Sequence, residues 1–247
     1  MKIIFTFPGQ GAQTPDMLHQ LPNGQTSKEL LDIASDTLQE DVLTLDTKEA
    51  LQKTRAAQLC CLITGIAYAT LLKQQGVIPD FTSGLSIGAF PAAVCAGALD
   101  FAAAVKLVSL RGELMEHAYP QGYGLTSIQG LYEQQVASLV TQVNSLQTPV
   151  YIANINAEDQ FVIAGSVEAM QQVAELAKSC GARKITRLAV SVPSHCELLV
   201  KPAHQLAEAM QAIEFKQPTI AYLSGSTGRV IWQPAKIADD LAYNMLG

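Results

Sequence analysis

Residues 81–89 read Phe-Thr-Ser-Gly-Leu-Ser-Ile-Gly-Ala, and this stretch decides the fold. It places a Gly-x-Ser-x-Gly sequence between a short apolar run and a segment of small residues, the strand, turn and helix context of a nucleophile elbow. The two glycines let the backbone turn sharply and place no Cβ beside the serine. Ser86 would project at the helix N-terminus, where backbone N–H groups favour an oxyanion. The stretch predicts Ser86 as a nucleophile, and the alternative is a Ser/Gly turn that only caps a helix.

The segments around this elbow predict an α/β body. The apolar run at residues 3–7 ends at a Pro-Gly pair, which favours a buried strand followed at once by a turn. The Ala/Leu-rich segment at 54–75 contains no proline and is followed by a glycine, which is typical of a largely buried helix. A strand at 81–83 and a helix at 89–98 flank the elbow. The helical pattern that starts at Ala235 is followed by only a few residues, so we expect a further C-terminal segment.

Residues from about 122 to 190 predict a different unit. Strand, helix, strand, strand, helix and strand follow one another at residues 125–129, 132–143, 150–154, 161–164, 167–179 and 184–189. This βαββαβ order is that of a ferredoxin-like unit. We therefore predict a main domain formed by residues 1–120 and 192–247, with residues 121–191 inserted. The candidate hinges are Pro120, Gly122, Gly124 and Pro193.

The composition excludes several classes of partner. The formal net charge is −6 and the lysines and arginines form no cluster, so neither a nucleic acid nor an anionic membrane is expected to bind. The chain has no run of 18 apolar residues, and the apolar run at its start is too short for a secretory signal. The five cysteines are odd in number and lack metal-ligand spacing, so we expect reduced thiols, a cytoplasmic address and no metal. The Gly-x-Gly at residues 9–11 lacks the third glycine of a dinucleotide-binding loop, and no cofactor is expected.

A serine nucleophile needs a neighbouring base, and the chain offers four histidines. His19 and His117 lie among polar residues, and His204 lies on a predicted helix. His195 follows the last strand of the inserted unit at a turn, where a side chain can reach another element, so it is the favoured base. A structural or solvated histidine is the alternative for any single turn position. Cys196 is a rival nucleophile, but no helix-terminal elbow presents it.

Arg111 is predicted to face inward. In the segment at 101–116 the polar residues fall on one side at about 100° per residue, and Arg111 falls roughly opposite them. The polar residues are Lys106, Ser109, Glu113 and Glu116, and the apolar ones around Arg111 are Val108, Leu114 and Met115. A buried guanidinium needs a carboxylate partner. That partner is either a structural Asp or Glu or the carboxylate of a substrate.

Taken together, these motifs resemble the malonyl-CoA:acyl carrier protein transacylases. The residues that carry the resemblance are the sequence 7–11 (Phe-Pro-Gly-Gln-Gly), the elbow, Arg111-Gly112 with Met115, Asn154-x-Asn156, Gln160-x-Val162-Ile163-Ala164-Gly165, and Val192-Pro193-Ser194-His195. The resemblance implies an α/β-hydrolase-like main domain with an inserted ferredoxin-like subdomain. It implies malonyl-CoA and an acyl carrier protein as partners.

The same resemblance implies a role for each matching residue. Ser86 would be the acylated nucleophile and His195 its base, without a triad carboxylate. The substrate carboxylate would bind Arg111. The other positions are Gln10 and Ile87 for oxyanion-hole N–H groups, Gln58, Asn154 and Met115 for the pocket lining, and Asn244, in place of a glutamine, for orienting the histidine.

The elbow departs from the family pattern of Gly-His-Ser-x-Gly-Glu. Leu85 stands where the family has histidine, and Ala89 stands where it has glutamate. This variant resembles the acyltransferase subunit of biotin-independent malonate decarboxylase, whose carrier has a dephospho-CoA-derived arm instead of plain phosphopantetheine. That branch is the favoured interpretation, with other decarboxylase subunits as partners. The alternatives are the transacylase of fatty-acid synthesis, a serine thioesterase or esterase, and a non-catalytic assembly subunit.

Overall fold

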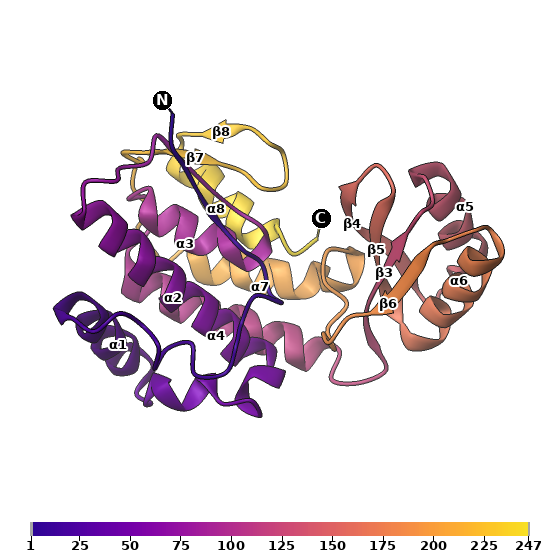
Figure 1. The fold of residues 1–247 in the computed structure, drawn as a ribbon, viewed down its shortest axis with the longest axis horizontal. Coiled ribbons are helices and arrows are strands. Elements are labelled where there is room, and N and C mark those ends of the chain that lie inside the picture. The colour runs from indigo at the N-terminus through magenta and orange to yellow at the C-terminus, as the bar shows by residue number, and fades with distance from the viewer. Residues whose placement is uncertain (1, 247) are drawn as a thin grey trace. The chain divides into compact units, whose positions relative to one another are not determined.

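The computed structural model describes residues 2–246 and divides into two compact units. The first comprises Met1–Leu114 and His204–Asn244, and the second comprises Met115–Ala203 and Met245–Gly247. The two main divisions, after Leu114 and after Ala203, lie outside the predicted boundaries at residues 121 and 191. One helix runs across each of these two divisions. Those helices are α4 (Phe101–Ala118) and α7 (Val200–Met210) (Figure 1).

The first unit is built on a mostly parallel sheet with the strand order β1-β2-β7-β8. The strands are β1 (Ile4–Phe7), β2 (Phe81–Gly84), β7 (Ala221–Leu223) and β8 (Val230–Ile231). The first three strands are parallel, and β8 pairs antiparallel with β7. The helices are α1 (Gln25–Leu38), α2 (Thr54–Gln74), α3 (Ala89–Cys95), most of α4, part of α7, and α8 (Pro234–Tyr243). This arrangement confirms the predicted α/β body.

The helix α2 forms the centre of the first unit. Most of its residues are buried, including Ala57, Leu59 and Ile63, which are fully inaccessible. A helix with most of its residues buried needs only a small polar face, which agrees with its largely apolar sequence. By length and composition alone α2 is apolar enough to cross a membrane, but most of it is buried inside the protein, as in the core helix of a globular domain.

The helix that follows the elbow is shorter than predicted. It ends at Cys95 and not at residue 98. Gly97 adopts a left-handed conformation with φ of 81°, and the N–H of Ala98 donates to the carbonyl of Ala93 at 2.9 Å. This bond pattern closes a helix C-terminus around a glycine. The helix therefore stops one turn before the sequence pattern does.

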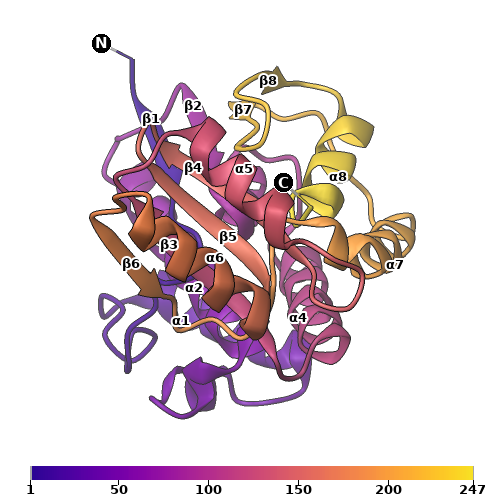
Figure 2. The same ribbon diagram turned by 90° about the vertical axis from the view of Figure 1, so that its right-hand side faces the viewer.

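The second unit has the predicted βαββαβ order. It consists of β3 (Tyr123–Gln129), α5 (Glu133–Val143), β4 (Val150–Ala157), β5 (Gln160–Ser166), α6 (Val167–Ser179) and β6 (Lys184–Arg187). The strand order is β4-β5-β3-β6 and every pairing is antiparallel, with α5 and α6 on one face (Figure 2). This is the ferredoxin-like topology that the element order predicts.

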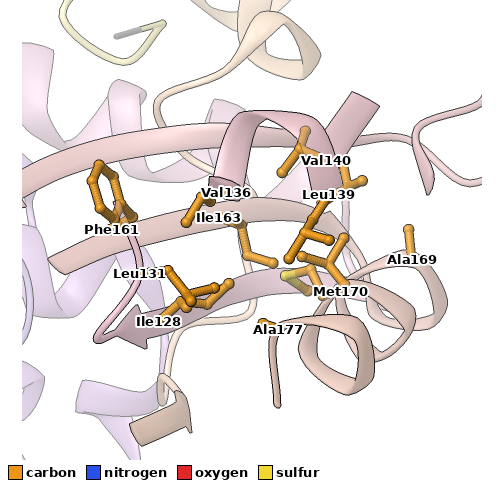
Figure 3. Packing of buried hydrophobic residues seen from close by; sticks show 12 residues of the cluster. Ile128, Leu131, Val136, Leu139, Val140, Phe161, Ile163, Ala169, Met170 and Ala177 are labelled. Atoms are coloured by element: carbon orange, nitrogen blue, oxygen red, sulfur yellow. The ribbon is translucent and has the colours of Figure 1, made fainter. Parts of the chain in front are cut away.

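Both faces of this second sheet are covered by apolar side chains. Along β5, Phe161 and Ile163 point to the helices, and Val162 and Ala164 point to the other face. On the helix face they pack with residues of α5 and α6 such as Leu139 (Figure 3). The second unit thus has its own hydrophobic core, and a strand that is apolar at successive positions is explained by burial on both sides.

Candidate active site

The elbow has the geometry that the sequence predicts. β2 ends at Gly84, and Ser86 follows with a φ of 54°, a conformation that L-residues rarely adopt and that often marks a functional turn. A Cβ on Gly84 would lie 1.9 Å from the carbonyl oxygen of Gly88, and one on Gly88 would lie 2.2 Å from that of Phe7. Both glycines are therefore required by close backbone packing. Ser86 is presented at the carboxyl edge of the sheet, and its nucleophilic role stays a prediction.

The turn after β1 lies beside the elbow. β1 and β2 are parallel with Phe7 opposite Gly84, and a Cβ on Gly9 would lie 3.2 Å from the carbonyl oxygen of Leu85. Gln10 follows in this turn and is half-buried. Because parallel strands end at the same edge, the segment that holds Gln10 and the elbow share that edge. The oxyanion-hole roles of Gln10 and of the buried Ile87 stay predictions.

Arg111 faces inward, as predicted, and its side chain is fully inaccessible to solvent. Its Nη2 donates to Ser86 Oγ at 3.1 Å and to Asn244 Oδ1 at 3.2 Å, and its guanidinium lies 6.0 Å from the centroid of the Phe90 ring. Among residues 2–246, no side chain forms an ion pair with Arg111, and its Nε and Nη1 have no hydrogen-bond partner. Burial lowers its pKa to about 10, so the guanidinium is cationic at neutral pH.

This arrangement decides one question that the sequence leaves open. Of the two expected carboxylate partners for Arg111, a structural Asp or Glu is not found among the described residues, in which the ion pairs of this region belong to Arg55. An uncompensated buried charge is costly, and a guanidinium fork fits a carboxylate in a bidentate manner. The site is therefore suited to a small anionic group that lies next to Ser86 Oγ.

Residues of α2 and α4 make close contacts beside Arg111. A Cβ on Gly112 would lie 2.4 Å from Cα of Arg55, so the glycine permits a close approach of the two helices. Ser109, which was expected on the solvent side, is buried because its Oγ accepts from Arg55 Nε at 2.8 Å. Gln58, predicted to line the pocket, is buried on α2.

Three of the predicted site residues belong to the second unit. His195 adopts a φ of 61°, and its backbone N–H donates to the carbonyl of Met245 at 2.8 Å. Asn154 lies on β4 at a register shift, a kind of irregularity that redirects side chains, and Met115 is buried on α4. Ser86 belongs to the first unit, and its pairing with His195 stays a prediction.

Cys196 is not suited to act as a rival nucleophile. Its thiol is buried and donates to the carbonyl of Pro193 at 3.2 Å. Burial raises the pKa of Cys196 to about 11, so the reactive thiolate is scarce at neutral pH.

One cluster of the described residues has metal-ligand spacing. It is formed by Asp16, His19 and Asp46. The Asp46 carboxylate already accepts from the backbone N–H groups of Leu18 and His19 and pairs with the His19 ring at 3.0 Å. The hydrogen bond to Asp46 raises the pKa of His19. These contacts give the carboxylate a structural role in holding residues 18 and 19.

An elbow serine beside a buried arginine that forms no ion pair among residues 2–246, on an α/β body that accompanies a ferredoxin-like unit, is typical of an acyltransferase. The chain belongs to the acyl transferase domain family, whose sequence model matches residues 4–241.

Three of the similar proteins are described as malonyl transacylases. The malonyl CoA-acyl carrier protein transacylase of Bacillus subtilis strain 168 is 36% identical over 97% of this chain and 77% of its own length. The solved structure of the Coxiella burnetii transacylase superposes with a TM-score of 0.93 at 33% identity, covering 99% of this chain and 79% of that one. A type II PKS acyl-carrier protein in complex with its malonyl-transacylase gives a TM-score of 0.92 at 33% identity, covering 99% and 81%. None of these three is described as a malonate decarboxylase subunit.

Proposed function

We propose that this chain transfers a malonyl group from malonyl-CoA to the thiol of an acyl carrier protein through an ester on Ser86. The observation that carries the proposal is Arg111, a fully buried cation hydrogen-bonded to Ser86 Oγ, with two guanidinium nitrogens lacking a partner among residues 2–246. A malonyl group differs from an acetyl group by one carboxylate, and a guanidinium binds that carboxylate in a bidentate manner. The names of the relatives support the same acyl group and acceptor.

The proposed reaction has two halves. His195 takes the proton from Ser86 Oγ as the oxygen attacks the thioester carbonyl, and the negative charge on the carbonyl oxygen is held by the N–H groups of Gln10 and Ile87. The C–S bond then breaks, and the CoA thiol leaves with the proton from His195. In the second half the carrier thiol gives its proton to His195 and attacks the ester carbonyl. The ester C–O bond then breaks, and Ser86 Oγ takes the proton back from His195.

Other residues are assigned supporting roles in this proposal. Gln58, Asn154 and Met115 would line the acyl pocket. Asn244 would help to orient His195, as the resemblance implies. The proposed reaction requires no carboxylate as the third member of a triad with Ser86 and His195.

Intact mass spectrometry tests the proposed function directly. After incubation with malonyl-CoA, the protein is expected to gain the mass of one malonyl group, because the ester forms before any acceptor is present. Ser86→Ala is the matched control and should gain nothing. Malonylation that persists in Ser86→Ala, or a wild-type protein that never acquires the label, would contradict an ester on this serine.

A second candidate is the acyltransferase subunit of malonate decarboxylase. The observation that favours it is the elbow itself, where Leu85 is 52% exposed and Ala89 is buried, in place of the histidine and glutamate of the transacylase pattern. An apolar residue beside the nucleophile alters the surface near the serine. The relatives named above favour the transacylase of fatty-acid synthesis instead.

Competition between two carriers separates these candidates. Malonylated protein is mixed with equal concentrations of a phosphopantetheine carrier and a carrier bearing a dephospho-CoA-derived arm. We expect transfer to the phosphopantetheine carrier to dominate, in agreement with the relatives. Preference for the other carrier would assign the chain to the decarboxylase branch, and release of free malonate faster than either transfer would indicate a thioesterase.

A further inference from the structure

Asn244 joins the buried arginine to the nucleophile elbow. Its side chain is nearly inaccessible, and its Oδ1 accepts from Arg111 Nη2 at 3.2 Å. Its Nδ2 donates to the backbone carbonyl of Ser86 at 3.1 Å. Because the same Nη2 also donates to Ser86 Oγ at 3.1 Å, the three residues form a closed ring of hydrogen bonds inside the first unit.

The position of Asn244 is itself fixed by a second set of bonds. Asp240 lies one turn earlier on α8 and accepts from the hydroxyls of Tyr222 and Ser224, each at 2.6 Å. Tyr222 lies on β7, which pairs directly with β2, and Ser224 follows that strand. The backbone N–H of Asn244 donates to the carbonyl of Asp240 at 3.0 Å. The amide is therefore held by the strand next to the one that carries the elbow.

Only a neutral side chain with both a donor and an acceptor satisfies this geometry. The guanidinium of Arg111 needs an acceptor, and the carbonyl of Ser86 needs a donor. A carboxylate at residue 244 would accept from the guanidinium, but it would neutralise the charge and repel the Ser86 carbonyl. An amide orients the guanidinium and leaves its positive charge available for an arriving anion.

We infer that Asn244 is a positioning residue that sets the preference for acyl groups bearing a carboxylate. It holds Nη2 of Arg111 at the elbow, and this leaves Nη1, which has no partner among residues 2–246, to bind the carboxylate. The inference deepens the proposed malonyl transfer and rests on it. It assigns Asn244 a role that is separate from orienting His195.

Asn244→Asp is the sharpest test, because the two side chains have the same shape. We expect the ratio of malonyl to acetyl transfer to fall on the order of 100-fold, since the new carboxylate occupies Arg111 in competition with the substrate. The loss should appear mainly as a raised KM for malonyl-CoA. Asn144→Asp, an exposed site at the end of α5 that keeps its acceptor for the Val150 N–H, should retain the wild-type ratio.

Binding measured without turnover gives an independent readout. In a Ser86→Ala background, calorimetry should show that Asn244→Asp weakens malonyl-CoA binding and leaves acetyl-CoA binding nearly unchanged. Asn244→Ala introduces no buried charge and is expected to lower the malonyl preference about 10-fold, so it keeps the test decisive if the Asp variant does not fold.

The possible outcomes distinguish the role of Asn244 from the proposed malonyl transfer. A folded Asn244→Asp or Asn244→Ala variant that keeps the wild-type malonyl preference would overturn the role of Asn244 alone. An equal loss with both acyl groups would do the same, because it would reduce Asn244 to a support of the elbow. A wild-type protein that shows no preference for malonyl-CoA over acetyl-CoA would instead refute the proposed function, and this inference with it.

Discussion

Ser86→Ala and His195→Ala are each expected to reduce malonyl transfer on the order of 10⁵-fold, and the double variant is expected to be hardly worse. The serine supplies the attacking oxygen and the histidine removes its proton, so the loss of either one removes the same coupled step. Residues that act as a unit show such non-additive losses. The measurement is single-turnover transfer from malonyl-CoA, with the double variant assayed at the same enzyme concentration.

Melting temperatures provide the control for this pair of variants. Ser86 and His195 both have positive φ, at 54° and 61°, and alanine is strained there much as they are, so only a small change in melting temperature is expected in each variant. Losses that add in the double variant would show that the two residues act in separate steps, and the proposed Ser86 and His195 dyad would then be wrong.

Arg111→Ala is expected to shift selectivity from malonyl toward acetyl groups by about two to four orders of magnitude. Breaking a buried charged pair costs about 3–5 kcal/mol, and each 1.36 kcal/mol corresponds to about tenfold in rate. Acetyl groups carry no carboxylate, so acetyl transfer should fall far less. The measurement is kcat/KM for malonyl-CoA and acetyl-CoA, with the exposed Arg229→Ala as the matched control, which should leave the ratio unchanged.

Arg111→Lys is expected to restore little of this selectivity. A lysine keeps the positive charge but lacks the planar fork that donates to Ser86 Oγ and Asn244 while it binds a carboxylate. Unchanged malonyl selectivity in both the Ala and Lys variants would assign Arg111 to the stability of the first unit. The proposed substrate class would then lose its main support.

Local sequence was sufficient for features that depend on neighbouring residues. The elbow followed from five consecutive residues, because Gly84 and Gly88 are required within a single turn. The inward position of Arg111 followed from the period of one helix. The βαββαβ order of the second unit followed from alternation and turn signals, since each of its elements except β6 is long enough to show a pattern.

Patterns in the local sequence do not predict very short elements or contacts between residues far apart in the chain. β7 and β8 contain three and two residues, so no periodicity marks them, although β7 is the strand that pairs with β2. The predicted boundaries at residues 121 and 191 differ from the divisions between the compact units for a related reason: α4 and α7 continue across these divisions, and a continuous helix gives no local boundary signal.

The sequence by itself determined that a serine elbow, an inward arginine and two kinds of α/β unit are present, because each depends on residues close in the chain. Only the tertiary structure decided what Arg111 contacts. Its partner Asn244 is 133 residues away, and Asn244 is 158 residues from the Ser86 carbonyl that it also binds. No periodicity or spacing links positions so far apart. They meet because the parallel pairing of β2 with β7, and the anchoring of α8 to the end of β7, bring the last helix to the elbow.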